Sequence, residues 1–130
     1  LEAEKRLLGL ISQSKKLYKM SSAQIKADEF ATDVYRRLAK SMYDSYENGM
    51  SPDPAMMLND FSGDDLSEAS EVFYNLEVYS GDEETVKELL YTIKLEKLNM
   101  RINAETDPTN LMDLFKQREE LLNEKNTWEE

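Results

Sequence analysis

The amino-acid sequence predicts an all-α protein, with a compact helical bundle followed by a long helix and a C-terminal helical hairpin. Helix-forming Leu, Glu, Lys, Ala and Met recur throughout the chain, whereas β-branched residues are sparse. Only 4 Gly and 3 Pro interrupt its 130 residues. Apolar residues recur at intervals of three and four positions, which is the period of an amphipathic helix.

Helix-ending and helix-starting residues divide the first part of the chain into five helices. Asn48-Gly49 provides the left-handed residue that commonly ends a helix. Asp53 and Pro54 provide an N-cap and a favourable first helical residue. We expect Asp28 to cap the longest of these helices. The predicted helices cover residues 2–12, 15–23, 28–48 and 54–61, and a fifth extends from the turn at 62–65 to about residue 78.

A sixth helix, predicted over residues 82–104, carries two apolar stripes on nearly opposite faces. The stripes comprise Val86, Leu89, Leu90 and Ile93, and Tyr91, Leu95, Leu98 and Ile102. One packing partner does not require two stripes, so the first half is expected to close the bundle and the second half to pack against a seventh helix. Asp107-Pro108 starts that helix, which reaches about residue 125. We therefore predict a bundle subdomain, 1–80, and a C-terminal hairpin subdomain, 81–130.

The residue types that are missing exclude several classes of function. The chain has no Cys and no His, which excludes disulfides, thiol or imidazole catalysis and Cys/His zinc sites. We expect no catalytic residue, cofactor or metal in this domain. No run of apolar residues is long enough to span a membrane, and no signal peptide is visible, so we expect a cytoplasmic protein. The chain begins at Leu1 rather than Met, which we interpret as the start of a piece of a longer protein.

The net charge of −11 is unevenly distributed along the chain. Residues 1–40 carry nine Lys and Arg against five Asp and Glu, whereas residues 41–80 carry nine acids and no Lys or Arg. An acidic body repels phosphate backbones, so direct binding of nucleic acid is not expected. The acidic segment 41–80 is interpreted either as a solvated surface or as a patch that attracts a basic partner.

The seventh helix carries more apolar surface than a two-helix hairpin can bury. Its stripe comprises Leu111, Leu114, Phe115, Leu121 and Leu122, and part of it is expected to face another protein. Arg118 lies within the stripe, where it pairs either with an acid of the sixth helix, such as Glu96 or Glu105, or with a partner. Trp128 is either part of a frayed terminus or an aromatic anchor. The seven Tyr residues are expected to pack with their hydroxyl groups at the surface.

Several local motifs, taken in order, resemble the helicase-binding C-terminal domain of bacterial DNA primases. They are Ala3-Glu4 leading into Leu7-Leu8, the Tyr43…Tyr46-Glu47-Asn48-Gly49 helix end, Asp53-Pro54 with Leu58, and the long sixth helix followed by a hairpin. The resemblance implies a non-catalytic domain of a DNA-directed RNA polymerase (a primase, hence a transferase). It implies docking onto the N-terminal domains of the hexameric replicative ring helicase, with recruitment of primase to the fork and modulation of both activities. On this reading the isolated domain is a monomer.

The resemblance also places the partner contacts on the terminal hairpin. The residues it implies are Leu111, Leu114, Phe115, Arg118, Leu122 and Trp128. Two alternatives remain open. One is the N-terminal domain of the replicative helicase itself, which predicts a domain that associates with its own copies. The other is a generic helical adaptor.

Overall fold

The computed structural model describes residues 2–74 and 82–129, and every regular element in those ranges is helical. The predicted all-α fold class is therefore confirmed. The chain divides into two compact units, Leu1–Leu90 (unit 1) and Tyr91–Glu130 (unit 2). The subdomain boundary predicted at 80/81 lies outside the described residues.

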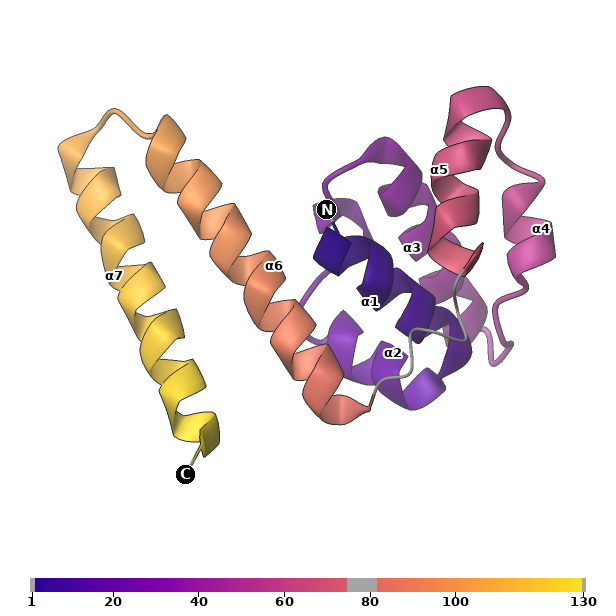
Figure 1. Ribbon diagram of the computed structural model, residues 1–130, viewed down its shortest axis with the longest axis horizontal. Helices are drawn as coiled ribbons and strands as arrows, with labels where there is room; N and C mark the ends of the chain where they lie inside the picture. The colour runs from indigo at the N-terminus through magenta and orange to yellow at the C-terminus, as the bar shows by residue number, and fades with distance from the viewer. Residues whose placement is uncertain (1, 75–81, 130) are drawn as a thin grey trace. The chain divides into compact units, whose positions relative to one another are not determined.

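The first two helices of unit 1 are α1, Glu2–Gln13, and α2, Lys15–Ser22 (Figure 1). Ser14 separates them because its side chain accepts a hydrogen bond from the backbone N–H of Leu17, which makes it the N-cap of α2. Both helices agree with the sequence prediction within one residue of their ends. Their apolar faces are buried by packing against each other and against α3, Asp33–Glu47.

The start of α3 differs from the prediction that Asp28 caps this helix. Ala27–Glu29 forms a separate 3-10 turn, η1, and the side chain of Thr32 caps α3 by accepting from the N–H of Tyr35 at 3.0 Å. Between them the chain is extended and held by α1, because the buried carboxylate of Glu4 accepts from the N–H of Ala31 at 2.7 Å. This tertiary contact, which local capping signals do not encode, delays the helix by five residues.

The end of α3 and the next two helices follow the predicted turn chemistry. Gly49 has φ +74°, the left-handed conformation expected where α3 ends. Asp53 caps α4, Pro54–Leu58, by accepting from the N–H of Ala55 at 3.0 Å. Gly63, with φ +59°, begins α5, Gly63–Tyr74, which packs against α4, α3 and α1. The predicted last turn of this helix, 75–78, lies outside the described residues.

The core of unit 1 is completed by the first turns of α6, Glu83–Ala104. Asp82 starts this helix by accepting from the N–H of Thr85 at 3.2 Å. Lys16 of α2 forms an ion pair with Glu83. Val86, Leu89 and Leu90 are 0%, 7% and 3% exposed, so this stripe of α6 is buried as the sequence predicted.

Two tyrosines contradict the expectation of surface hydroxyl groups. The Tyr43 hydroxyl donates to the carbonyl oxygen of Ile25 at 2.9 Å, and the Tyr46 hydroxyl donates to that of Ile11 at 2.6 Å, both in buried surroundings. The ring of Tyr18 stacks on Tyr46 with centroids 4.6 Å apart and meets Tyr43 edge-on at 5.1 Å. These contacts join α1, α2, the segment before η1, and α3. The two hydroxyl groups provide the hydrogen-bond donors that these buried carbonyl oxygens need.

Alkaline pH should destabilise unit 1 through its buried phenols. Burial raises the pKa of Tyr43 well above its usual range, and burial followed by the negative charge of Glu68 raises the pKa of Tyr35 to about 12. A phenol with a pKa raised above the unfolded value of about 10 keeps its proton in the folded state, so stability is full below that pH and falls as pH rises above it. Urea unfolding between pH 8 and pH 11.5 should show this loss. The free energy of unfolding should fall less steeply with pH for Tyr43→Phe than for the unmodified chain. Equal slopes for both proteins would contradict the assignment to Tyr43.

Unit 2 is an antiparallel helical hairpin made by the second part of α6 and by α7, Pro108–Asn126 (Figure 1). Asp107 caps α7 by accepting from the N–H of Thr109 at 2.9 Å, with Pro108 as the first helical residue, as predicted. A 3-10 turn, η2, Thr127–Glu129, follows. Trp128 packs edge-on against Tyr91 with ring centroids 5.9 Å apart, so it closes the open end of the hairpin rather than fraying. None of the described helices is long and apolar enough to cross a membrane.

Candidate functional site

The six residues predicted to bind a partner all lie on the second helix of unit 2 or in η2, but they occupy different environments. Leu114 is 3% exposed and belongs to the interior of the hairpin, whereas Phe115 and Leu122 are 42% and 41% exposed. Leu111, Arg118 and Trp128 are half-buried. Phe115 and Leu122 therefore remain accessible to another protein.

Arg118 is held inside the hairpin, by a neutral partner rather than by the acids considered from the sequence. Its Nη1 donates to Oδ1 of Asn99 on α6 at 2.9 Å, and its guanidinium lies 5.2 Å from the centre of the Phe115 ring. The amide oxygen satisfies a donor without neutralising the charge. Arg118 thus links α6 to α7 and orients the ring of Phe115.

Arg118→Ala should lower the stability of the hairpin. The variant loses a part-buried hydrogen bond to a charged group and the contact with the Phe115 ring, together worth about 1–3 kcal/mol. Thermal unfolding should show a reduced Tm for Arg118→Ala and for Asn99→Ala, and the double variant should lose less than the sum of the two single losses, since both remove the same bond. Lys116→Ala, which removes an exposed cation from the same helix, should leave Tm unchanged. An unchanged Tm for Arg118→Ala would contradict this structural role.

A continuous exposed seam runs along α7 and includes Met112, which lies outside the apolar stripe predicted for this helix. Met112 is 72% exposed and lies three positions before Phe115, which in turn lies seven before Leu122. Glu119 occupies the intermediate position, so the α7 seam (Met112, Phe115, Glu119, Leu122) follows the alternating three- and four-residue spacing of a coiled-coil seam. Met112 belongs to this outer seam rather than to the inward stripe, and the alternating three- and four-residue spacing through Phe115, Glu119 and Leu122 leads back to it.

The other side of the hairpin is charged. Lys94, Lys97 and Arg101 of α6 and Glu120 and Glu124 of α7 line a hollow of about 410 Å³ with an apolar floor of Leu98 and Leu121. Cations from one helix therefore face carboxylates from the other across this side. The apolar seam and the charged hollow lie on different edges of α7, since Glu120 and Leu122 are two residues, and so about 200°, apart on a helix.

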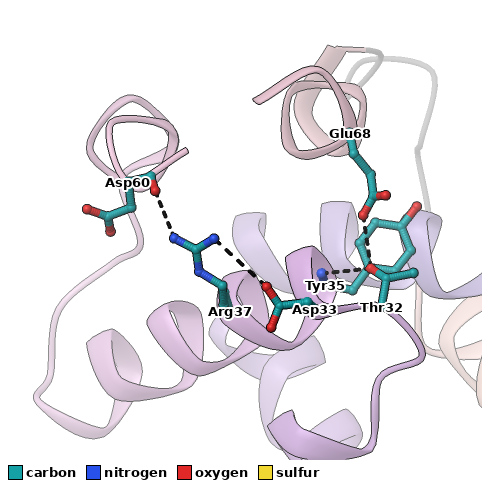
Figure 2. Close-up of polar contacts among 6 residues, drawn as sticks. All are labelled: Thr32, Asp33, Tyr35, Arg37, Asp60 and Glu68. Carbon is teal, nitrogen blue, oxygen red and sulfur yellow. Dashed lines mark hydrogen bonds and ion pairs between the residues drawn. The ribbon is translucent and has the colours of Figure 1, made fainter. Parts of the chain in front are cut away.

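Unit 1 holds a second group of polar side chains, around the start of α3 (Figure 2). Arg37 donates to the carbonyl oxygen of Asp60 at 2.8 Å, lies 4.0 Å from Asp33, and stacks at 4.3 Å over the Phe61 ring. On the other side of α3, Thr32 donates to Glu68 of α5 at 2.9 Å (Figure 2). These contacts attach α5 and the segment before it to α3, so they are structural. Within residues 2–74 and 82–129, no group of three or more acids is placed to hold a metal ion.

Comparison with protein-family models identifies the bundle. Residues 1–95 match the model of the DnaB-like helicase N-terminal domain. The comparisons with curated proteins and with solved structures gave no match. The matched range contains all of unit 1 and ends within α6, so most of the hairpin lies beyond it.

This match corrects the resemblance to primases. The chain is not the helicase-binding domain of a primase, and it is not part of a transferase. The predicted partner is also wrong: the matched domain is part of a helicase, so the replicative helicase is not a separate protein onto which the chain docks. The physical reason for the error is that capped helices, an Asn-Gly helix end and an Asp-Pro start are local signals. Helical bundles of different families can carry the same local signals. Because the model covers well over half of the chain, the chain belongs to the family of DnaB-like helicase N-terminal domains.

Proposed function

We propose that this chain is the non-catalytic N-terminal association domain of a replicative DNA helicase, acting in the cytoplasm by holding copies of the helicase together. Membership of the family supports the placement in a helicase. A ring helicase requires contacts between identical subunits, and most closed assemblies of identical chains use such contacts symmetrically. Unwinding itself would belong to other parts of the protein, in keeping with a sequence that has no His and no Cys.

The observation that carries this proposal is the exposed α7 seam. Leu114 is the one α7 residue that is fully buried, while Met112, Phe115 and Leu122 expose 72%, 42% and 41% of their surface along one line. Large apolar side chains aligned in this way favour burial against another helix, at about 1.5–3 kcal/mol for each side chain fully buried. Of the predicted partner residues, Phe115 and Leu122 therefore carry the proposed contact.

A second copy of the same helix fits the seam. The positions 112, 115, 119 and 122 are symmetric about residue 117, so a two-fold antiparallel pairing would set Met112 of one copy against Leu122 of the other. Phe115 would then lie over the aliphatic part of Glu119, at the centre of the contact. In a two-fold contact the same patch serves both subunits, which a seam with this internal symmetry allows. The result is a four-helix arrangement of two hairpins.

Phe115→Asp combined with Leu122→Asp should abolish self-association. The molar mass of the unmodified chain, measured by light scattering over a range of concentrations, should rise from that of one chain to that of two. The double variant should remain a single chain, with its dissociation constant raised at least about a hundredfold, because each copy would bring two carboxylates into the contact, four in all.

The control is Met100→Asp, which places one carboxylate on an exposed methionine of α6 in the same hairpin. It should associate as the unmodified chain does, and circular dichroism should show that all three proteins are equally helical. A chain that stays monomeric at every concentration, or equal weakening by Met100→Asp, would contradict the proposal.

A further inference from the structure

Unit 1 carries a basic hollow, which is separate from the α7 seam of unit 2. A depression of about 410 Å³ is lined by Lys26, Ala27, Asp28, Arg36, Arg37 and Lys40. Four cationic side chains and one carboxylate give it a net charge of +3, in a chain whose net charge is −11. The cations come from two segments, the residue before η1 and three positions on α3. Folding thus gathers positive side chains at one place on a protein whose net charge is negative.

The two arginines are held in place without being neutralised. Nη1 of Arg36 donates to the carbonyl oxygens of Phe30 and Ala31 at 3.1 and 3.2 Å. Nη2 of Arg37 donates to the carbonyl oxygen of Asp60 at 2.8 Å (Figure 2). Backbone carbonyls fix the guanidinium groups but leave their formal charges intact, and each fork has further N–H donors. Both side chains are therefore ordered before any ligand arrives, which reduces the entropy cost of binding.

The carboxylates beside the hollow oppose the cations only weakly. Arg37 lies 4.0 Å from Asp33, and Lys40 lies 3.9 Å from Asp44, and both are exposed pairs within one helix. Exposed pairs of this kind are weak, because water and salt screen the two charges. An anion carrying more than one negative charge would compete with them successfully.

We propose that this hollow binds the phosphate groups of a small phosphorylated molecule, such as a nucleoside di- or triphosphate. Phosphate oxygens accept several hydrogen bonds at once, and arginine forks and lysine ammonium groups are the side chains that bind them most strongly. The volume lies within the range of about 300–1,000 Å³ found for small-molecule sites. A single carboxylate carries one negative charge and two oxygen atoms, so it would use fewer of the four cations than a di- or triphosphate does.

A nucleic-acid strand fits the same hollow less well than a small phosphate. The carboxylates of Asp28, Asp33, Asp44 and Asp60 lie among or beside the cations. A strand that crosses the hollow has to pass these acids with a phosphate at every nucleotide, which is repulsive, whereas a di- or triphosphate can stop within it.

The test is a titration of the whole chain with sodium pyrophosphate at low salt, followed by backbone amide NMR. Shifts should concentrate at Lys26, Arg36, Arg37 and Lys40, and binding should weaken as salt is added. Lys26→Ala with Lys40→Ala should weaken binding about tenfold or more, since it removes two of the four cations but no contact that orders the arginines. Lys15→Ala with Lys19→Ala, which removes the same charge from exposed positions of α2, is the matched control and should bind normally.

Three outcomes would overturn the proposal. The first is equal weakening in both double variants, which would show a response to net charge alone. The second is the absence of pyrophosphate shifts at the hollow while a single-stranded oligothymidylate produces them, which would assign the site to a nucleic-acid backbone. The third is a poly-glutamate peptide that binds as tightly as pyrophosphate, which would assign it to an acidic protein segment. None of these three results depends on whether the chain associates through the α7 seam.

Discussion

A chain that ends at residue 81 is expected to lose most of the stability of unit 1, whereas a chain that ends at residue 95 should keep it. The shorter fragment lacks Val86, Leu89 and Leu90, which are 0%, 7% and 3% exposed and complete the core of that unit. At about 1.5–3 kcal/mol for each buried side chain, the loss is roughly 5–9 kcal/mol, which is comparable to the whole stability of a small domain. The ion pair of Lys16 with Glu83 is solvent-exposed and adds little to this figure.

Urea unfolding followed by circular dichroism at 222 nm measures this difference directly. The fragment 1–95, which is the range matched by the family model, is the control because it retains these side chains and lacks α7. It should unfold cooperatively, and the fragment 1–81 should be partly or wholly unfolded without denaturant. If the two fragments had the same urea midpoint, the first turns of α6 would contribute nothing to the bundle.

Local sequence signals predicted the helices well where the ends are set by residues close in sequence. Asp53 and Asp107 cap the helices that follow them, and Gly49 has the left-handed φ expected after α3. Each of these ends depends on a hydrogen bond or a backbone preference that spans two or three residues. That is why a single sequence contains enough information to place them.

The wrong predictions concern features that depend on contacts between residues far apart in the sequence. Asp28 was a plausible cap for α3, but Glu4, 27 positions earlier, holds the backbone of Ala31 extended, and the helix begins at Asp33 instead. The hydroxyl group of Tyr46 reaches a carbonyl 35 positions away. Neither contact has a signature in the residues around it, so periodicity and capping rules cannot find it.

The candidate site was predicted in part for the same reason. Helical spacing placed Leu114, Phe115 and Leu122 on one stripe, but only the packed hairpin separates Leu114, inside, from Phe115 and Leu122, outside. Met112 joins the outer seam once that separation is known. The identity of the domain depended least on local signals. The order of capped helices does not distinguish one helical family from another, whereas the family match over residues 1–95 did.

Tyr46→Ala is expected to be the most damaging single substitution among the buried tyrosines. Tyr46 is 6% exposed, stacks on Tyr18 and donates at 2.6 Å to the carbonyl oxygen of Ile11 near the end of α1. Removing a large buried ring costs about 3–5 kcal/mol, because the cavity that remains closes only in part. Loss of the stacked pair adds about 0.5–1.5 kcal/mol.

Tyr46→Phe separates the hydroxyl group from the ring. It keeps the ring and its stacking but removes the donor, so it should cost about 1 kcal/mol; the loss is limited because the Ile11 carbonyl also accepts from the N–H of Ser14, at 3.4 Å. Tyr74→Ala, at a position that is 83% exposed, is the control and should change the free energy of unfolding by less than about 0.5 kcal/mol. If Tyr46→Phe proved as destabilising as Tyr46→Ala, the hydrogen bond rather than the ring would be holding α3 against α1. Tyr46→Ala should cost far more than Tyr46→Phe, because the ring is buried and stacks on Tyr18, whereas the hydroxyl group makes one hydrogen bond.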